Sequence, residues 1–331
     1  MDLPKVGIVI VTYNTYKKTN ACLNSLCNDN YPNKTIVHVD SASNNPDVIG
    51  DFEKRFTGKL NISFIYLKDN LGYGHACNIG AKELKECKYI VFLNNDVILE
   101  EGWLFPLVEE VEKDTSVAVV QPKILNRINK QLFDYAGGAG GFMDYFFYPF
   151  CRGRILFKVE KDNNQYDLKT DICWASGACM LVSRKVFEDM AGFDENYFMY
   201  VEENDLCLRI WNYGKRVRFI PDSRVYHEGC LTVSAYINNK KTFYLHRNDL
   251  YMMVKNTDIK TLMFIFPLRV FFDFLSGIFY LLVYPRNVIF LINSYLSFFK
   301  NLPKYLRIRR NNSFKGPFSP DFPIFKGSVV L

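Results

Sequence analysis

The N-terminal third of the chain alternates between short apolar runs and segments with helical spacing. Residues 5–11, Lys-Val-Gly-Ile-Val-Ile-Val, have the β-branched content of a buried strand, and apolar runs recur at residues 34–40, 61–67 and 89–97. Residues 16–27 place apolar side chains at helical intervals instead. This repetition predicts a doubly wound parallel α/β sheet with a nucleotide site along its carboxyl edge.

Polar side chains stand where these strands end. Thr12, Tyr13 and Asn14 close the first strand, and Asp40 closes the second. Asp40 is placed to accept a hydrogen bond from a ribose hydroxyl or a base, although it is equally suited to cap the following helix. Asp96 closes the fourth strand and is a hard oxygen ligand for a divalent cation beside a phosphate; the alternative is an Asx-type turn.

A glycine-rich stretch, residues 69–80, follows the third strand and leads into a helix. The dinucleotide fingerprint requires Gly-x-Gly-x-x-Gly after the first strand, with an acid about 20 residues later. Here the position is different and Cys77 replaces the third glycine, so a nicotinamide enzyme is a weak alternative. Small residues at a helix N-terminus still allow a diphosphate to approach closely.

Composition supports a large folded domain with an appendage. The chain has 331 residues, of which 49% are hydrophobic and 23% charged, so a substantial core is available. The nine cysteines form no Cys-x-x-Cys pair, a pattern that favours reduced thiols in the cytosol. The first residues carry no recognisable export signal.

Several motifs, in order over residues 5–256, resemble family-2 glycosyltransferases, most closely their rhamnosyltransferase-like branch. They are Val-Thr-Tyr-Asn at 11–14, the strand ending at Asp40, Asn-Leu-Gly-Tyr-Gly…Asn-Ile-Gly at 70–80, Leu-Asn-Asn-Asp-Val at 93–97, Trp-Ala-Ser-Gly-Ala-Cys-Met-Leu at 174–181, Gly-Phe-Asp-Glu at 192–195, the acidic stretch 197–209, His-Glu-Gly at 227–229 and the stretch 244–256. Each motif alone is weak, and their shared order carries the resemblance.

The resemblance implies a GT-A fold, in which a nucleotide-binding αβα half and an acceptor-binding half share one mixed sheet. We expect the catalytic domain at residues 1–257, with the nucleotide-sugar half at about 1–122 and the acceptor half at about 123–257. It also implies an inverting transfer from a nucleotide-diphospho-sugar. By position, the residues expected at the nucleotide are Thr12, Tyr13, Asn14, Asp40, Asn70, Asn78 and Asn95.

Asp96 matches the main carboxylate of the family's metal motif. Nucleotide diphosphate leaves well only when its growing charge is neutralised, and Mg²⁺ or Mn²⁺ does this. One carboxylate can suffice, because phosphate oxygens and water complete the shell. The usual motif carries further acid or a proline, whereas this chain has Asn94 and Asn95 before Asp96.

The acidic run Glu202-Glu203-Asn204-Asp205 is the candidate source of the general base that an inverting transfer needs. The family pattern is Glu-Asp-x-Asp with the second acid as base, so Glu203 is our choice. Glu202 is its substitute, and Asp205 is a supporting residue that fixes the loop or helix. The alternative is a solvated first turn of a helix at residues 206–213.

Four further residues are assigned by the resemblance. His227 would lie by the diphosphate or ligate the metal, unless it is a structural histidine. Trp174 and Gly177 would form the sugar and acceptor floor, and Trp174 as plain core is nearly as well supported. Arg247 would bind a phosphate of the donor or of a lipid-diphosphate acceptor, or else form a surface ion pair.

Two regions lie outside these motifs. Residues 133–157, rich in glycine and aromatic residues, predict a long irregular loop that could act as a lid. Residues 258–310 predict aromatic-rich amphipathic helices, broken at Pro267 and Pro285 and ending in a basic cluster, with no uncharged run long enough to span a membrane. They suit a membrane surface or, alternatively, a helical subdomain packed on protein. The tail, 311–331, is expected to be irregular.

The sequence therefore predicts a metal-dependent glycosyltransferase in the cytoplasm, peripheral on the inner face of the cell membrane. Its partners would be a dTDP- or UDP-sugar, a polysaccharide or lipid-linked glycan acceptor, and the membrane surface. No nucleic-acid recognition module accompanies the basic cluster. A homo-oligomer remains open. The competing hypothesis is a non-catalytic partner that binds nucleotide sugar or glycan on the same fold.

Overall fold

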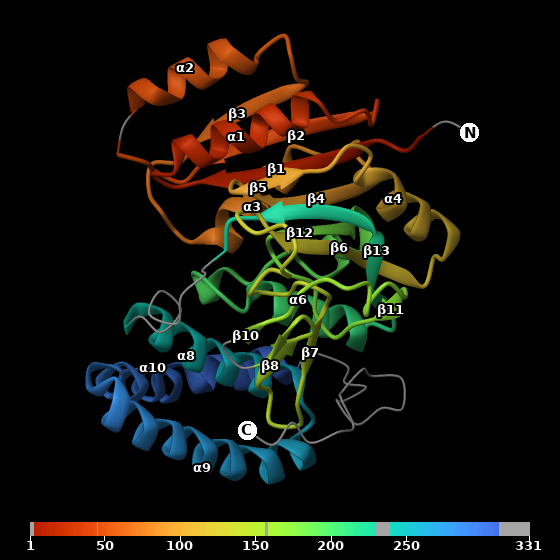
Figure 1. The fold of residues 1–331 in the computed structure, drawn as a ribbon. Helices are drawn as coiled ribbons and strands as arrows, with labels where there is room; N and C mark the ends of the chain where they lie inside the picture. The colour runs from red at the N-terminus through yellow and green to blue at the C-terminus, as the bar shows by residue number, and fades with distance from the viewer. Residues whose placement is uncertain (1–2, 45, 156–157, 230–238, 311–331) are drawn as a thin grey trace.

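The computed structural model describes residues 3–44, 46–155, 158–229 and 239–310. Within them a nine-stranded mixed sheet runs through the molecule (Figure 1). Its strands are β1 (Val6–Thr12), β2 (Lys34–Asp40), β3 (Ile62–Tyr66), β4 (Tyr89–Asn94), β5 (Val97–Leu99), β6 (Val117–Asn126), β11 (Thr170–Asp171), β12 (Cys179–Ser183) and β13 (Arg216–His227). The order is β11-β13-β6-β12-β4-β1-β2-β3, with β5 paired to β13.

The helices connect and flank these strands. They are α1 (Tyr16–Cys27), α2 (Pro46–Phe56), α3 (Tyr73–Lys82), α4 (Leu104–Lys113), α5 (Arg184–Asp189), the 3₁₀ turn η1 (Glu195–Tyr197), α6 (Glu202–Asn212), α8 (Asn239–Asn256), α9 (Ile259–Val283) and α10 (Pro285–Arg310). The three C-terminal helices lie at the end of the molecule farthest from α2 and β3 (Figure 1).

The predicted parallel sheet is confirmed in the N-terminal half. β1 lies between β2 and β4 and is parallel to both, and β3 extends the sheet from β2. β12 then pairs with β4 and β6 in the antiparallel sense, which makes the sheet mixed. The carboxyl ends of β1, β2 and β4 therefore meet at one edge, as polar residues at the strand ends require.

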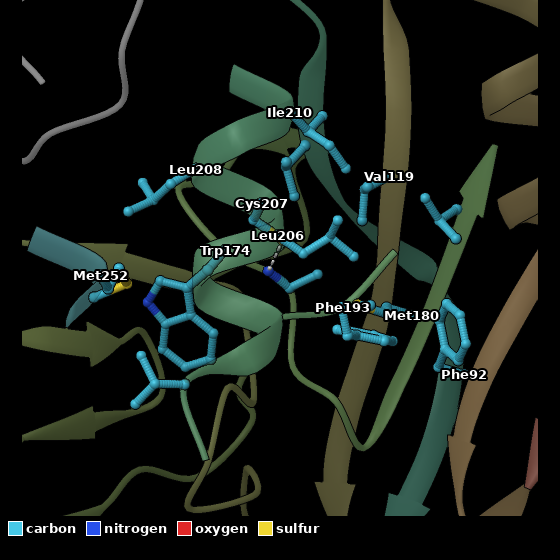
Figure 2. Packing of buried hydrophobic residues seen from close by; sticks show 14 of the residues in the cluster. Phe92, Val119, Trp174, Met180, Phe193, Leu206, Cys207, Leu208, Ile210 and Met252 are labelled. Carbon is cyan, nitrogen blue, oxygen red and sulfur yellow. Dashed lines mark hydrogen bonds between the residues drawn. The ribbon is translucent and has the colours of Figure 1, made fainter. Parts of the chain in front are cut away.

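Both faces of the sheet are buried, which explains the nearly continuous apolar runs. In β4, Ile90 and Phe92 belong to one hydrophobic cluster, whereas Val91 and Leu93 belong to the other. Figure 2 shows the first cluster, where α6 packs its apolar side chains close to Phe92 and neighbouring residues of the sheet. This packing fixes the position of α6 against the sheet.

The prediction of an irregular loop at residues 133–157 is wrong in part. Two short antiparallel hairpins form there, β7 (Gly141–Met143) with β8 (Pro149–Cys151), and β9 (Arg154–Ile155) with β10 (Lys158–Val159). Gly141 packs so closely on the ring of Trp174 that an added Cβ would lie 2.1 Å from it. Tertiary packing on this ring orders a segment whose local sequence gives only a weak strand signal.

The C-terminal segment also departs from expectation. The helix break at Pro285 is present, because proline is tolerated in the first turn of α10. The break at Pro267 is absent: α9 continues through it, held in line by buried Leu262 and Ile265 before it and Arg269 after it. By length and composition alone α9 is also apolar enough to cross a membrane, although Arg269 and Asp273 interrupt its apolar run.

The entry to α3 yields a prediction about stability. Gly72 has φ 104° and ψ 167°, a region open essentially to glycine only, and an added Cβ would lie 2.2 Å from the carbonyl oxygen of Phe198. We expect Gly72→Ala to lower the free energy of unfolding by about 3 kcal/mol. Chemical denaturation measures this loss.

Gly50→Ala is the matched control, since Gly50 lies in α2 with no atom within 4 Å of its added Cβ. It should stabilise the protein by about 0.5–1 kcal/mol. Equal effects of the two substitutions would show that the backbone conformation of Gly72 is unimportant.

Candidate active site

The acidic run begins α6, directly after a turn with unusual backbone angles. Phe198, Tyr200 and Val201 have positive φ values of 64°, 68° and 74°. Such angles cost on the order of 1–3 kcal/mol each for residues other than glycine, and they persist only where surrounding contacts enforce them. The turn brings Glu202 and Glu203 to the wall of a cavity of about 460 Å³.

Asn248 of α8 holds this turn in place. Its buried side-chain amide donates to the carbonyl oxygens of Tyr197, Met199 and Tyr200 at 3.1, 2.9 and 2.8 Å. These contacts satisfy carbonyl groups that the strained turn leaves without regular partners. Asn248 thus fixes the point at which α6 begins.

Asp205 anchors α6 to neighbouring segments of the chain. Its Oδ2 accepts hydrogen bonds from Arg209 and Lys255, both at 2.8 Å, and its Oδ1 accepts from Asn256 at 2.8 Å and Tyr197 at 3.2 Å. Burial alone would raise the pKa of Asp205, but Lys255 and Arg209 hold it well below its usual range. With every oxygen committed to the chain, Asp205 is placed to support α6.

Glu202 and Glu203 have a different environment. Glu202 is buried, and its Oε2 has no hydrogen-bond partner among the described residues. Burial, with the neighbouring Glu203, raises the pKa of Glu202 well above the ordinary value. Burial also raises the pKa of Glu203, whose Oε1 lies beside Gly177. The burial of Glu202 and Asp205 excludes the solvated-turn alternative for these two acids.

Asp96 and His227 both line the cavity and are in contact with each other. His227 Nε2 lies 3.1 Å from Asp96 Oδ1, and His227 Nδ1 lies 3.1 Å from Oδ1 of the buried Asp134. Burial alone would lower the pKa of His227, but the carboxylates of Asp134 and Asp96 raise it to about 10. An imidazole oriented by a second carboxylate is the usual arrangement of a metal-bound histidine.

Only glycine fits at position 229, beside Asp134 and His227. An added Cβ at Gly229 would lie 2.4 Å from Asp134 Oδ1, which explains the glycine of the His-Glu-Gly motif. In the described part of the chain, no three His, Cys, Asp or Glu side chains gather as a metal cluster. Any cation here would therefore rely on ligands from a bound molecule or water to complete its shell.

Positive charge adjoins Asp96. Lys18 Nζ lies 3.4 Å from both Asp96 Oδ2 and Glu228 Oε1, and Glu228 also pairs with Arg127 at 2.8 Å. Burial alone would raise the pKa of Asp96, but His227 and Lys18 lower it, so the carboxylate is ionised. Lys18, which faces the same cavity, could contact a phosphate there.

The polar ends of β1 and β2 form a second group. Asn14 has φ 55°, and its backbone N–H donates to Ser43 Oγ at 2.8 Å. Asp40 is buried and accepts a hydrogen bond from the backbone N–H of Ser43 at 2.8 Å, while its Oδ2 has no partner among the described residues. Tyr13 is half exposed beside them. This edge presents acceptors and an aromatic ring, as a nucleoside site would require.

Three residues assigned to the nucleotide bond to the chain instead. Asn78 exchanges hydrogen bonds with the backbone of Phe193 at 2.9 Å in both directions. Asn95 donates to Thr15 and Thr19 at 2.6 and 2.7 Å, and Thr12 is fully buried. Thr12 Oγ1 lies 2.8 Å from both Thr19 Oγ1 and His38 Nε2, so the Thr12 hydroxyl, both amide atoms of Asn78 and the Asn95 Nδ2 already bond to the chain. Asn70 also braces the edge, accepting from the Gly72 N–H at 3.1 Å.

The predicted floor residues lie in the cavity lining. Trp174 is largely buried, and its indole N–H donates to the carbonyl of Phe142 at 2.7 Å, so it serves both the core and the cavity. Figure 2 shows its ring packed against α6. The carbonyl of Gly177 accepts from the Tyr73 hydroxyl at 3.2 Å. The Trp174 ring and the backbone at Gly177 together form one wall of the cavity.

Arg247 does not join the site. Its guanidinium donates to the carbonyl of Tyr197 at 2.9 Å and to Asn248 Oδ1 at 2.8 Å, and it lies over the rings of Phe243 and Tyr244. The prediction that it binds phosphate therefore has no support in the geometry. Its role is to brace the turn and Asn248.

Sequence reasoning missed four residues of this region: Lys18, Asp134, Tyr73 and Asn248. Lys18 lies in the helix after the first polar strand end, which was the one available signal. Asp134 was hidden in the segment expected to be an irregular loop, and Asn248 adjoins the arginine that was chosen. Their distances from the site along the chain gave no indication of contact.

The turn at residues 197–201 yields a second stability prediction. We expect Asn248→Ala to lower the free energy of unfolding by about 2–3 kcal/mol, because it leaves buried carbonyl groups unsatisfied. Asn301→Ala is the control, since the Asn301 amide donates to the Ser297 carbonyl within its own helix, at 2.8 Å. Urea titration of both variants measures the difference. Equal losses would contradict the role of Asn248.

Known proteins share both the sequence pattern and the fold. The family model described as Glycosyl transferase family 2 matches residues 7–191, more than half of the chain. The chain is 32% identical over 162 residues to Rhamnosyltransferase WbbL of Escherichia coli (strain K12). That match covers 47% of this chain and 60% of the relative's length.

Solved structures show the fold at lower identity. GalNAc-T7 with UDP, GalNAc and Mn²⁺ superposes with a TM-score of 0.61 at 18% identity, covering 78% of this chain and 49% of that one. The mannosyltransferase PcManGT from Pyrobaculum calidifontis, in complex with GDP-Man and Mn²⁺, has a TM-score of 0.56 at 13% identity and covers 94% and 85%. The chain belongs to glycosyl transferase family 2, has its GT-A fold, and is rhamnosyltransferase-like in sequence, as its motifs predicted.

Proposed function

We propose that the protein is an inverting glycosyltransferase that moves a sugar, such as rhamnose, from a nucleotide-diphospho-sugar to a hydroxyl of a cell-surface polysaccharide or lipid-linked glycan. One observation carries the proposal: Glu203, Asp96 and His227 line the same cavity. An inverting displacement needs a base for the attacking hydroxyl and charge stabilisation for the leaving group. Glu203 would supply the base, and Asp96 and His227 would support the charge stabilisation.

Asp96 and His227 fit a divalent metal such as Mg²⁺ or Mn²⁺. They offer one ionised oxygen ligand and one imidazole held by Asp134, whose Nε2 proton would be released when a metal binds, and phosphate oxygens with water would complete the shell. When bound, the metal would offset the negative charge that develops on the diphosphate. Lys18 adds a positive charge beside Asp96 without a metal. Tyr13, Asn14, Asp40 and Asn70 would hold the nucleoside at the neighbouring edge.

We assign the general base to Glu203. Its carboxylate lies in the cavity beside Gly177, where an acceptor hydroxyl could approach, and its raised pKa increases its basicity. Glu202 is the more buried acid and lies next to Glu203. We therefore propose that Glu202 stays protonated when Glu203 ionises. As a neutral carboxyl it would donate a hydrogen bond into the site. Tyr73 and Cys77 are the titratable groups of α3 that face the pair.

These roles predict different outcomes for two isosteric changes. Glu203→Gln should lower kcat about 10²–10⁴-fold while donor binding is retained. Glu202→Gln should have a much smaller effect, because an amide also donates a hydrogen bond. Wild-type kcat should rise with pH as Glu203 ionises, at a pH above the ordinary glutamate pKa of about 4.3. Loss of activity in Glu202→Gln alone would reverse the assignment.

The metal and donor site can be tested by thermal shift with UDP, dTDP and GDP and their sugars, with and without Mn²⁺. A nucleotide at 100 times its Kd stabilises the native state by about 2.7 kcal/mol. We expect a metal-dependent shift in the wild type that Asp96→Asn abolishes. Metal-dependent binding without hydrolysis or transfer for any donor and acceptor would instead favour the non-catalytic binding partner.

A further inference from the structure

α9 and α10 expose a broad apolar face, defined by outward side chains that include Met263, Phe264, Phe274, Leu282 and Leu296. Their exposed fractions range from 63% to 78%. Contiguous apolar surface of this kind on a folded protein marks a site that another body covers. The occupant can be identified from the charges and contacts around the face.

The exposed charges carried by α9 and α10 are of one sign. Residues 259–310 contain a single acid, Asp273, which is buried. Lys260, Arg286, Lys300 and Arg307 are exposed on the same two helices. A second copy of this chain docked here would bring like charges together, whereas a bilayer with anionic headgroups would complement them.

The orientation of α9 follows from its buried side. Leu262, Ile265, Arg269 and Asp273 recur at helical intervals and face the protein, and the rest of the helix is largely apolar and exposed. A helix bound along one side to a folded domain presents its other sides to the surface of a bilayer, lying in the plane of the membrane.

Arg269 joins this helix to the cavity. Its guanidinium donates to the carbonyl oxygens of Phe146 and Phe147 at 3.0 and 3.1 Å, lies 3.8 Å from the ring centre of Tyr148, and donates to Asp273 at 3.0 Å. These aromatic residues form the turn between β7 and β8. The hairpin is therefore clamped to α9 through a fully buried arginine.

The far side of the hairpin reaches the site. Pro149 and Cys151 of β8 line the cavity that contains Glu203, and β7 bonds to Trp174. The apolar face, the hairpin and the cavity wall thus form one continuous set of contacts.

We propose that α9 and α10 lie in the surface of a membrane containing anionic lipids, and that Arg269 positions the β7–β8 hairpin so that the cavity receives its acceptor from that surface. The inference about the acceptor rests on the proposed function, whereas the membrane contact does not. A lipid-linked glycan, whose lipid stays in the bilayer, is the acceptor class that this arrangement suits.

Vesicle co-sedimentation of the full chain tests the membrane contact. We expect binding to vesicles of phosphatidylcholine with phosphatidylglycerol, weaker binding to phosphatidylcholine alone, and weakening by salt. Leu282→Asp should reduce binding about tenfold or more, since it places a charge in the apolar layer. Leu168→Asp is the matched control, because Leu168 is 79% exposed and Leu282 is 78% exposed, and Leu168 lies outside α9 and α10.

Two results would overturn the membrane contact. One is the absence of vesicle binding together with concentration-dependent self-association, which Leu282→Asp abolishes; that would assign the face to a second copy. The other is equal loss of binding in Leu282→Asp and Leu168→Asp. Glu203→Gln should bind vesicles like the wild type, so a failure of the catalytic proposal would not be confused with a failure of docking.

Hydrogen exchange tests the connection through Arg269. Vesicle binding should slow exchange in α9 and in the hairpin at residues 141–151, and leave β2 and β3 unchanged. Arg269→Lys keeps the positive charge, but an ammonium group cannot reproduce the set of hydrogen bonds that the planar guanidinium makes with the hairpin and Asp273. It should retain vesicle binding and lose the protection of the hairpin. Hairpin protection that persists in this variant, or that is absent in the wild type, would overturn the connection.

Discussion

The buried carboxylate of Asp205 is the interaction on which the site depends. It joins the first turn of α6 to Lys255 and Asn256 at the end of α8 and to Tyr197 before the strained turn. A buried charge is costly unless it is fully paired, and removing one partner of such a pair typically costs about 3–5 kcal/mol. The chain satisfies both oxygens, so α6 and α8 hold one relative position.

That fixed position makes the strained turn possible. Three residues with positive φ precede Glu202, and Asn248 of α8 holds their carbonyl groups. Only because α8 is already attached to α6 is the Asn248 amide in reach. The result is two acids in one cavity with different surroundings: Glu202 buried and without a partner for one oxygen, Glu203 beside open space.

The part of the cavity wall that contains His227 and Asp96 also depends on contacts between segments that are distant in sequence. His227 ends β13 and pairs with Val97 of β5, so this pairing brings the adjacent Asp96 close to His227, but Asp134 comes from the segment between β6 and β7. Asp134 sets the orientation and charge of the imidazole. The part of the cavity wall formed by β8 likewise belongs to a hairpin whose position depends on a C-terminal helix.

The sequence by itself determined the parallel N-terminal strands, which are encoded locally in runs of β-branched residues and in polar strand ends. The GT-A class came from the resemblance of its ordered motifs to a known family, and some of these motifs, such as those that contain Asp96 and His227, line the cavity. The tertiary structure alone decided which polar groups remain available. Asn78 and Asn95 match their motifs, yet both amide atoms of Asn78 and the Nδ2 of Asn95 bond to the chain, whereas Asp134 contacts His227 and Asn248 holds the turn before α6 without a local signal. The physical reason is that a hydrogen-bond partner is set by distance in space, which no local pattern records.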